Sequence, residues 1–252
     1  MLPVSRLNRI KELVLEKKCV TVSELSDLFH VTPETIRRDL KALEDDGVLK
    51  KTYGGAYIED GVSNEVNFSI RETLLVENKH RLAKRCCEFI SNGDTIFLDA
   101  STTVGCLCEA ITGMRLTILT NSINVLTKLS ACSSIGLISI GGNLSAKSMS
   151  FVGVSAVQSL NNYYVDKAFI SCEALSIPGG LTDSNEDQAK IRQTAIRRSK
   201  ETYVLADHTK FNKSCFQNIN NFEGIDCLIV DQPLSGEWTE FLSAKGVQLI
   251  VC

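Results

Sequence analysis

The chain has 252 residues, of which 44% are hydrophobic and 23% are charged, and its formal net charge at pH 7 is −3. These values are typical of a globular protein. The slightly acidic balance argues against a strongly basic protein that coats nucleic acid without specificity. The length suits one small domain followed by a larger one with a substantial core.

The first thirty residues predict two short helices. The first helix is indicated by apolar residues at helical spacing, namely Leu7, Ile10, Leu13 and Val14. Residues 20–22 then predict a short extended segment, and residues 24–29 predict the second helix, with Ser23 as its N-cap.

The strongest local signal begins at Thr32. Thr32 is a favourable N-cap, and Pro33 suits the first position of a helix. Ile36, Leu40 and Leu43 then recur at i, i+4 and i+7, which gives this third helix a single apolar stripe.

A tight connection at residues 30–31 joins the second and third helices. Two short helices joined in this way are typical of a helix-turn-helix motif, which here spans about residues 20–39. Residues 48–53 leave too little sequence for another helix, so they predict a small β-hairpin wing. The alternative is a small helical bundle whose basic residues form only a solvated face.

Hydroxyl and basic groups lie on the outer side of the third helix and on the wing, where they can contact phosphate oxygens and base edges of DNA. Residues 1–57 hold 10 Lys and Arg against 9 Asp and Glu, so the placement of positive charge has to provide the contact. The expected DNA-binding residues are Ser23, Thr32, Glu34, Thr35, Arg37, Arg38, Lys41, Lys50, Lys51 and Tyr53.

This segment resembles the DeoR family of bacterial transcriptional regulators. The runs Thr32–Leu40 and Tyr53–Ala56 carry the resemblance. The family usually has Ser where this chain has Thr32, and it often has Arg-His ahead of the paired glycines, where this chain has Thr52 and Tyr53. The resemblance implies a winged helix-turn-helix DNA-binding domain at residues 3–58.

The pattern changes after the wing. Residues 59–74 are turn-rich and lack sustained periodicity, so they are expected to form a linker. In residues 75–252, short apolar strands alternate with amphipathic helices, which predicts an α/β domain with a mostly parallel sheet covered on both faces. The strands are expected at residues 95–98, 116–119, 135–140, 167–172, 202–206, 225–230 and 247–251.

Polar residues follow several of these strands. Ligands of open α/β sheets bind at the carboxyl ends of the strands, so we expect these residues to meet at one edge. Residues 101–103 open a helix, whose N–H groups suit a phosphate, whereas Asp99 and Asn121 offer acceptors for sugar hydroxyls. The expected effector-binding residues are Asp99, Ser101, Thr102, Thr103, Asn121, Gly141, Gly142, Lys167, Asp207 and Lys210.

Each of these residues also has a purely structural interpretation. Asp99 and Asp207 can cap the turns that follow their strands, and the glycines at 141–142 can serve only to reverse the chain. Lys167 lies near a strand start, where a lysine can be solvated or form a salt bridge.

Residues 75–252 are also similar to the effector-sensing domain of DeoR-type regulators, which is related to ribose-5-phosphate isomerase and the CoA transferases. The matching segments include Thr120–Ser122, the glycines at 141–142 and Asp207–Phe211. The resemblance implies a phosphorylated sugar or a related metabolite as the effector. Ser101 stands where the family loop usually has glycine, which changes how closely the backbone approaches that ligand.

The ten cysteines predict neither disulfides nor a metal site. Cys86 and Cys87 are adjacent, and Cys106 and Cys108 are two apart, so neither pair has Cys-x-x-Cys spacing. The first helix does not have the pattern of a signal peptide, so small buried thiols in a reducing cytoplasm are expected. We expect no metal and no cofactor. A redox-sensing regulator that uses these cysteine pairs is an alternative.

These patterns together predict a cytoplasmic, metabolite-responsive repressor of a carbohydrate-metabolism operon. Its expected partners are double-stranded operator DNA, a phosphorylated sugar and further copies of the chain in a dimer or tetramer. No apolar stretch is long enough to span a membrane. The rival prediction is a sugar-phosphate isomerase or hydrolase with an accessory DNA-binding head, in which Asp99, Glu173 and Lys210 supply acid, base and phosphate clamp.

Overall fold

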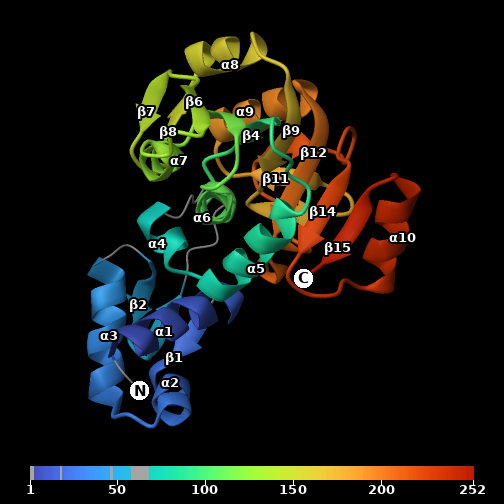
Figure 1. The fold of residues 1–252 in the computed structure, drawn as a ribbon. Coiled ribbons are helices and arrows are strands. Elements are labelled where there is room, and N and C mark those ends of the chain that lie inside the picture. Colours follow the sequence, from blue (N-terminus) through green and yellow to red (C-terminus); the bar gives the residue numbers. More distant parts are fainter. Residues whose placement is uncertain (1–2, 18, 46–47, 58–67) are drawn as a thin grey trace. The chain divides into compact units, whose positions relative to one another are not determined.

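The computed structural model describes residues 3–17, 19–45, 48–57 and 68–252 (Figure 1). It divides into two compact units, Met1–Leu75 and Val76–Cys252. We call them the N-terminal unit and the C-terminal unit and describe each by itself. None of the described helices combines the length and hydropathy of a membrane span.

The N-terminal unit is a winged helix-turn-helix, as the sequence predicts. Its three antiparallel strands are ordered β1-β3-β2, so the hairpin of β2 and β3 forms the wing. The elements are α1 (Pro3–Lys17), β1 (Cys19–Thr21), α2 (Val22–Phe29), α3 (Pro33–Asp45), β2 (Lys50–Thr52), β3 (Gly55–Tyr57) and α4 (Phe68–Glu72).

The predicted apolar stripes form the core of this unit. Ile10 of α1, Leu25 of α2 and Ile36 of α3 are all buried in one cluster. Gly55 is required where β3 approaches β1, because a Cβ at this position would lie 2.1 Å from the carbonyl oxygen of Val20.

Two expectations for the N-terminal unit are wrong. The N-cap of α2 is Thr21, whose side chain accepts a hydrogen bond from the backbone N–H of Glu24, and Ser23 lies in the first turn instead. Residues 58–67 of the expected linker lie outside the described residues. Residues 68–72 form α4, and Ile70 and Leu74 belong to the core of the N-terminal unit, so residues 68–74 are not linker.

The C-terminal unit is built on a seven-stranded sheet ordered β15-β14-β12-β9-β4-β5-β6, in which every neighbouring pair is parallel. Successive strands extend the sheet from β4 toward β6 and then from β9 toward β15, so the direction of winding changes between β4 and β9. The strands are β4 (Thr95–Leu98), β5 (Leu116–Thr120), β6 (Ile135–Ser139), β9 (Val165–Ile170), β12 (Ser199–Ala206), β14 (Cys227–Val230) and β15 (Gln248–Val251).

Helices cover both faces of this sheet, as the apolar strands predict (Figure 1). On β4, Phe97 joins the hydrophobic cluster of one face, and Ile96 and Leu98 join that of the other. One face is covered by α8 (Val154–Asn161), α9 (Glu186–Arg197) and α10 (Gly236–Ala244), and the other by α5 (Val76–Cys87), α6 (Leu107–Ile111) and α7 (Ile123–Leu129).

Two small antiparallel sheets in this unit are not predicted by the sequence. One is the hairpin of β7 (Asn143–Ser145) and β8 (Ser150–Val152). The other has the order β10-β11-β13, formed by β10 (Ala174–Ser176), β11 (Gly180–Asp183) and β13 (Gln217–Asn220). Their strands have only three or four residues, too few for periodicity to reveal.

Candidate functional site

The turn between α2 and α3 is fixed by local hydrogen bonds. His30 ends α2 in the left-handed conformation, with φ of 53°, and its backbone N–H donates to the carbonyl of Ser26. Thr32 then caps α3, because its Oγ1 accepts from the backbone N–H of Thr35 at 3.3 Å. The motif therefore rests on residues that the sequence already singles out.

The outer face of α3 is exposed and basic. Arg37 pairs with Glu34 at 3.1 Å, and Lys41 pairs with Asp45 at 2.8 Å. Hydrogen bonds to carboxylates raise the pKa of Lys41, first of all the one to Asp45. Arg38 is exposed and forms no ion pair with any residue that the structure describes, so its guanidinium is available to a ligand.

A buried ion pair connects α1 to α3 behind this face. Arg6 donates from Nε to Asp39 Oδ2 at 2.6 Å and from Nη2 to Asp39 Oδ1 at 3.2 Å. Both side chains are less than a tenth exposed. The hydrogen bond to Asp39 raises the pKa of Arg6, even though desolvation opposes the charge. This bidentate contact fixes the rotation of α3 about its axis relative to α1.

The wing presents an exposed aromatic tip. Thr52 pairs with Gly55, so Tyr53 and Gly54 alone form the loop, and the Tyr53 side chain is fully exposed. The backbone N–H of Lys51 donates to Glu44 Oε1 at 3.0 Å, which ties the wing to the end of α3. Tyr53 therefore projects from a hairpin that is itself held against α3.

At the carboxyl end of β4, Asp99 holds several segments together. It is 1% exposed. Its Oδ1 accepts from the backbone N–H of Ser101 at 2.9 Å, and its Oδ2 accepts from the N–H of Ser171 at 3.0 Å and from Arg192 Nε at 2.8 Å. Both oxygens are thus used within the fold, and the structural interpretation of Asp99 applies, rather than a direct contact with sugar hydroxyls.

The loop after Asp99 leaves two backbone N–H groups unused. Ser101 Oγ accepts from the backbone N–H of Val104 at 3.1 Å and thereby caps the 3-10 turn Val104–Cys106. The backbone N–H groups of Thr102 and Thr103 have no acceptor among the described residues, and both threonine side chains are buried. Unused N–H groups at the start of a helical turn suit an anion.

Asn121 follows β5 at the same edge of the sheet. It is fully buried, and its Nδ2 donates to the carbonyl of Phe151 at 3.2 Å. Its Oδ1 has no hydrogen-bond partner among the described residues. A buried acceptor without a partner costs free energy, and a ligand that donates a hydrogen bond relieves this cost.

The other predicted strand-end residues have mixed roles. Gly141 and Gly142 have positive φ, and a Cβ on Gly142 would come within 2.7 Å of Ala156, so this pair turns the chain beneath α8. Burial raises the pKa of Asp207, but Lys210 and hydrogen bonds from Thr209 outweigh this effect and lower it. Asp207 Oδ1 accepts from the backbone N–H of Thr209 at 3.0 Å and so caps the following turn.

Lys167 does not belong to this edge. Its Nζ forms a salt bridge with Asp94 Oδ2 at 2.6 Å. Asp94 immediately precedes β4, so the pair lies toward the amino ends of the parallel strands, opposite to the predicted ligand edge. The expectation that Lys167 binds the effector is wrong, because the carboxyl end of its strand lies beyond Ile170.

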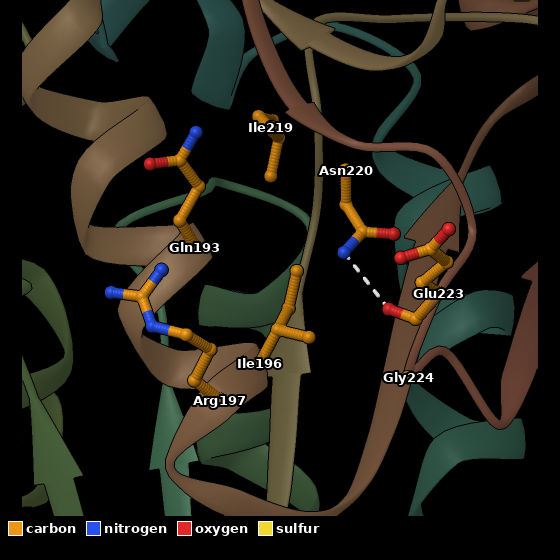
Figure 2. Close-up of a pocket in the computed structure, with 7 residues that line it drawn as sticks. All are labelled: Gln193, Ile196, Arg197, Ile219, Asn220, Glu223 and Gly224. Carbon is orange, nitrogen blue, oxygen red and sulfur yellow. Dashed lines mark hydrogen bonds between the residues drawn. The ribbon is translucent and has the colours of Figure 1, made fainter.

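A hollow of about 540 Å³ lies elsewhere in the C-terminal unit. Figure 2 shows side chains from the second half of α9 and from the end of β13 around it, with Asn220 Nδ2 donating to the carbonyl of Glu223 at 2.8 Å. None of the predicted effector residues is among its lining residues, which are Gln193, Ile196, Arg197, Ile219, Asn220, Glu223 and Gly224.

All ten cysteines are free. Burial raises the pKa of the Cys86 thiol well above its usual value and raises that of Cys108 to about 12. Because the thiolate is the reactive form, neither thiol fits a redox sensor that works near neutral pH.

Thiol modification tests the redox alternative. At pH 8 we expect Ellman's reagent to modify the exposed Cys19 within minutes, and Cys86 and Cys108 only after unfolding. Mass spectrometry of labelled peptides measures the order of modification. Rapid labelling of native Cys86, together with a change in DNA binding, would restore the redox interpretation.

Sequence comparison adds a separate finding. Residues 6–61 match the DeoR-like helix-turn-helix domain, and residues 75–232 match the DeoR C terminal sensor domain. The chain belongs to the DeoR family of transcriptional regulators. This match places it among regulators and not among sugar-phosphate isomerases, so the rival prediction of an enzyme is wrong.

Three relatives of this DeoR-family regulator align over nearly their whole lengths. The HTH-type transcriptional regulator YulB of Bacillus subtilis is 38% identical over 99% of this chain and 96% of its own. IolR of the same organism is 32% identical over 96% of both chains. The glycerol-3-phosphate regulon repressor of Escherichia coli is 28% identical over all of both.

Solved structures are more distant. The sorbitol operon regulator SorC of Klebsiella pneumoniae aligns with 95% of this chain and 98% of its own, at 13% identity and a TM-score of 0.42. A D-ribose-5-phosphate isomerase in complex with phospho-erythronic acid aligns with 54% of both chains, at 15% identity and a TM-score of 0.40.

Proposed function

We propose that this DeoR-family regulator represses a carbohydrate-metabolism operon and that a phosphorylated sugar changes its affinity for the operator. In this proposal α3 lies in the major groove, and Lys50, Lys51 and Tyr53 contact the adjacent backbone. The effector binds at the carboxyl edge of the parallel sheet, and the protein acts in the cytoplasm, where the chromosome is accessible. The name of the glycerol-3-phosphate regulon repressor supports a phosphorylated polyol or sugar as the class of effector.

One combination of groups carries the proposed effector site. Two unused backbone N–H groups, at Thr102 and Thr103, lie in the loop after β4, and the unpartnered Oδ1 of Asn121 lies after the neighbouring strand β5. The first pair suits a phosphate, and the second suits a sugar hydroxyl. This edge also contains the change in winding between β4 and β9, the usual ligand position in open α/β sheets.

We further propose that the regulator works as a dimer or tetramer. The described part of the chain contains one helix-turn-helix, and paired motifs read half-sites about one helical turn apart, or a multiple of it. A second motif raises affinity through effective concentration without any new kind of contact. Effector binding then changes the placement of the paired motifs.

Operator release tests the proposed function. Full-length protein is titrated onto a labelled fragment of its own upstream DNA, with and without glycerol 3-phosphate, ribose 5-phosphate, glucose 6-phosphate and fructose 1-phosphate. We expect one of them to change the operator affinity, whereas its unphosphorylated counterpart has no effect. Linkage requires that operator DNA change the affinity for that sugar by the same factor. If none of the phosphorylated sugars alters DNA binding, the proposed effector class is contradicted.

Removing one hydroxyl tests the site itself. Thr102→Val keeps the shape of the side chain but removes a donor to the phosphate, so we expect effector affinity to fall roughly 10- to 100-fold. Operator affinity without effector stays within about twofold, since the N-terminal unit is unchanged. Thr112→Val is the matched control, because Thr112 is exposed and donates only to the carbonyl of Glu109. Equal effector affinity in both variants would rule out the Thr102 contact.

A further inference from the structure

Helix α9 buries two long polar side chains one turn apart. Gln188 and Arg192 are separated by four residues, so they lie on the same face of the helix, and each is 4% exposed. Such burial is costly unless the groups are hydrogen-bonded. The sequence analysis assigns neither residue a role, and their partners come from two different loops.

Arg192 holds the loop after β4. Its Nε donates to Asp99 Oδ2 at 2.8 Å, and its Nη1 donates to Asp183 Oδ2. Although desolvation opposes the charge of Arg192, the two carboxylates raise its pKa, Asp183 more than Asp99. Asp99 in turn fixes the N–H of Ser101, so Arg192 supports the segment Asp99–Thr103 from behind.

Gln188 holds the hairpin of β7 and β8. Its Nε2 donates to Ser150 Oγ at 2.6 Å and to Ser148 Oγ at 2.9 Å. The next residue, Phe151, donates from its N–H to the carbonyl of Asn121 at 2.8 Å and accepts from Asn121 Nδ2. The orientation of the Asn121 side chain therefore depends on a hairpin that Gln188 anchors.

We propose that Gln188 and Arg192 are the positioning residues of the effector site: one rigid helix holds both the Asp99–Thr103 loop and the β7–β8 hairpin in register. This inference rests on the proposed function for the identity of the site. The two groups that we assign to the ligand, the N–H pair at residues 102–103 and Asn121 Oδ1, come from separate segments. A ligand that uses both needs them at a fixed separation, which supporting hydrogen bonds on a rigid element provide.

Amide hydrogen exchange without any ligand is the first test. The variants of the full chain are Gln188→Met and Arg192→Lys, and Gln193→Ala is the matched control on the same helix, since Gln193 contacts Asn218 instead. We expect Gln188→Met to speed exchange in residues 148–152, and Arg192→Lys to do so in residues 99–103, each by roughly two- to tenfold, the equivalent of one lost hydrogen bond. The control is expected to change neither segment.

Effector affinity is the second test. Isothermal titration with the phosphorylated sugar that binds the wild type is expected to give roughly two- to tenfold weaker binding for each variant. Operator affinity without sugar is expected to equal that of the wild type. Because Gln188→Met leaves no buried charge, it keeps the test decisive even if Arg192→Lys unfolds. A structural role alone would lower the melting temperature and leave the affinity of the folded fraction intact.

The outcomes separate this inference from the proposed function. If the wild type binds the sugar and both variants bind it equally well, the positioning role is overturned. Unchanged exchange in both segments overturns it as well. If the wild type binds no phosphorylated sugar, the proposed function fails, whereas the exchange result still decides whether α9 holds the two segments.

Discussion

Asp39→Ala is expected to destabilise the N-terminal unit by about 3 kcal/mol, because it leaves Arg6 buried without its partner. The pair is bidentate, with side chains 7% and 8% exposed, so solvent cannot replace the lost carboxylate. A loss of this size is a large part of the stability of a small domain. DNA binding is expected to fall with it, since α3 loses its fixed orientation against α1.

Two optical probes separate this effect from changes elsewhere. Trp238 is the only tryptophan of the chain and lies buried in the C-terminal unit, so its fluorescence reports that unit alone. We expect thermal unfolding of Asp39→Ala to shift in far-UV circular dichroism but not in Trp238 fluorescence. The double variant Arg6→Met/Asp39→Leu is expected to recover most of the loss, because two apolar side chains leave no buried charge. A loss below about 1 kcal/mol in the single variant would mean that the pair behaves like an exposed one.

The sequence predicts the elements of the N-terminal unit because apolar periodicity and burial coincide there. Ile36 and Leu40 mark the buried face of α3, and the opposite face follows from geometry. The cap of α2 shows the limit of this reasoning. Thr21 and Ser23 are both good capping residues, and only the extended backbone of Thr21 decides between them.

In the C-terminal unit the long apolar strands are predictable, but the partners of polar residues are not. Asp99 can be read from the sequence as a strand-end carboxylate, whereas its partner Arg192 is 93 residues away, and no spacing rule joins them. Lys167 was assigned to the ligand edge from its residue type alone, although its position within β9 places it toward the opposite end. Contacts of this kind depend on the tertiary fold, so a single sequence does not contain them in readable form.

Arg38→Ala is expected to weaken operator binding by about 1–3 kcal/mol, roughly 5- to 150-fold, and to relax sequence preference at one base pair of each half-site. Arg38 lies two residues after buried Ile36, about 200° around the helix from it, so it points away from the core. It forms no ion pair within the described residues and needs to break none before it contacts a base. A guanidinium with this freedom is suited to bidentate recognition of guanine.

Arg37→Ala is the matched control on the same helix. Arg37 lies only about 100° from Ile36, at the flank of the exposed face, and already pairs with Glu34. We therefore expect a smaller loss that is equal for all DNA sequences and that reduces the salt dependence of binding, as for a phosphate contact. Fluorescence anisotropy with the operator and with single-base variants, at several salt concentrations, measures both effects. If Arg38→Ala weakens all sequences equally, Arg38 contacts phosphate, and base reading belongs to another residue of α3.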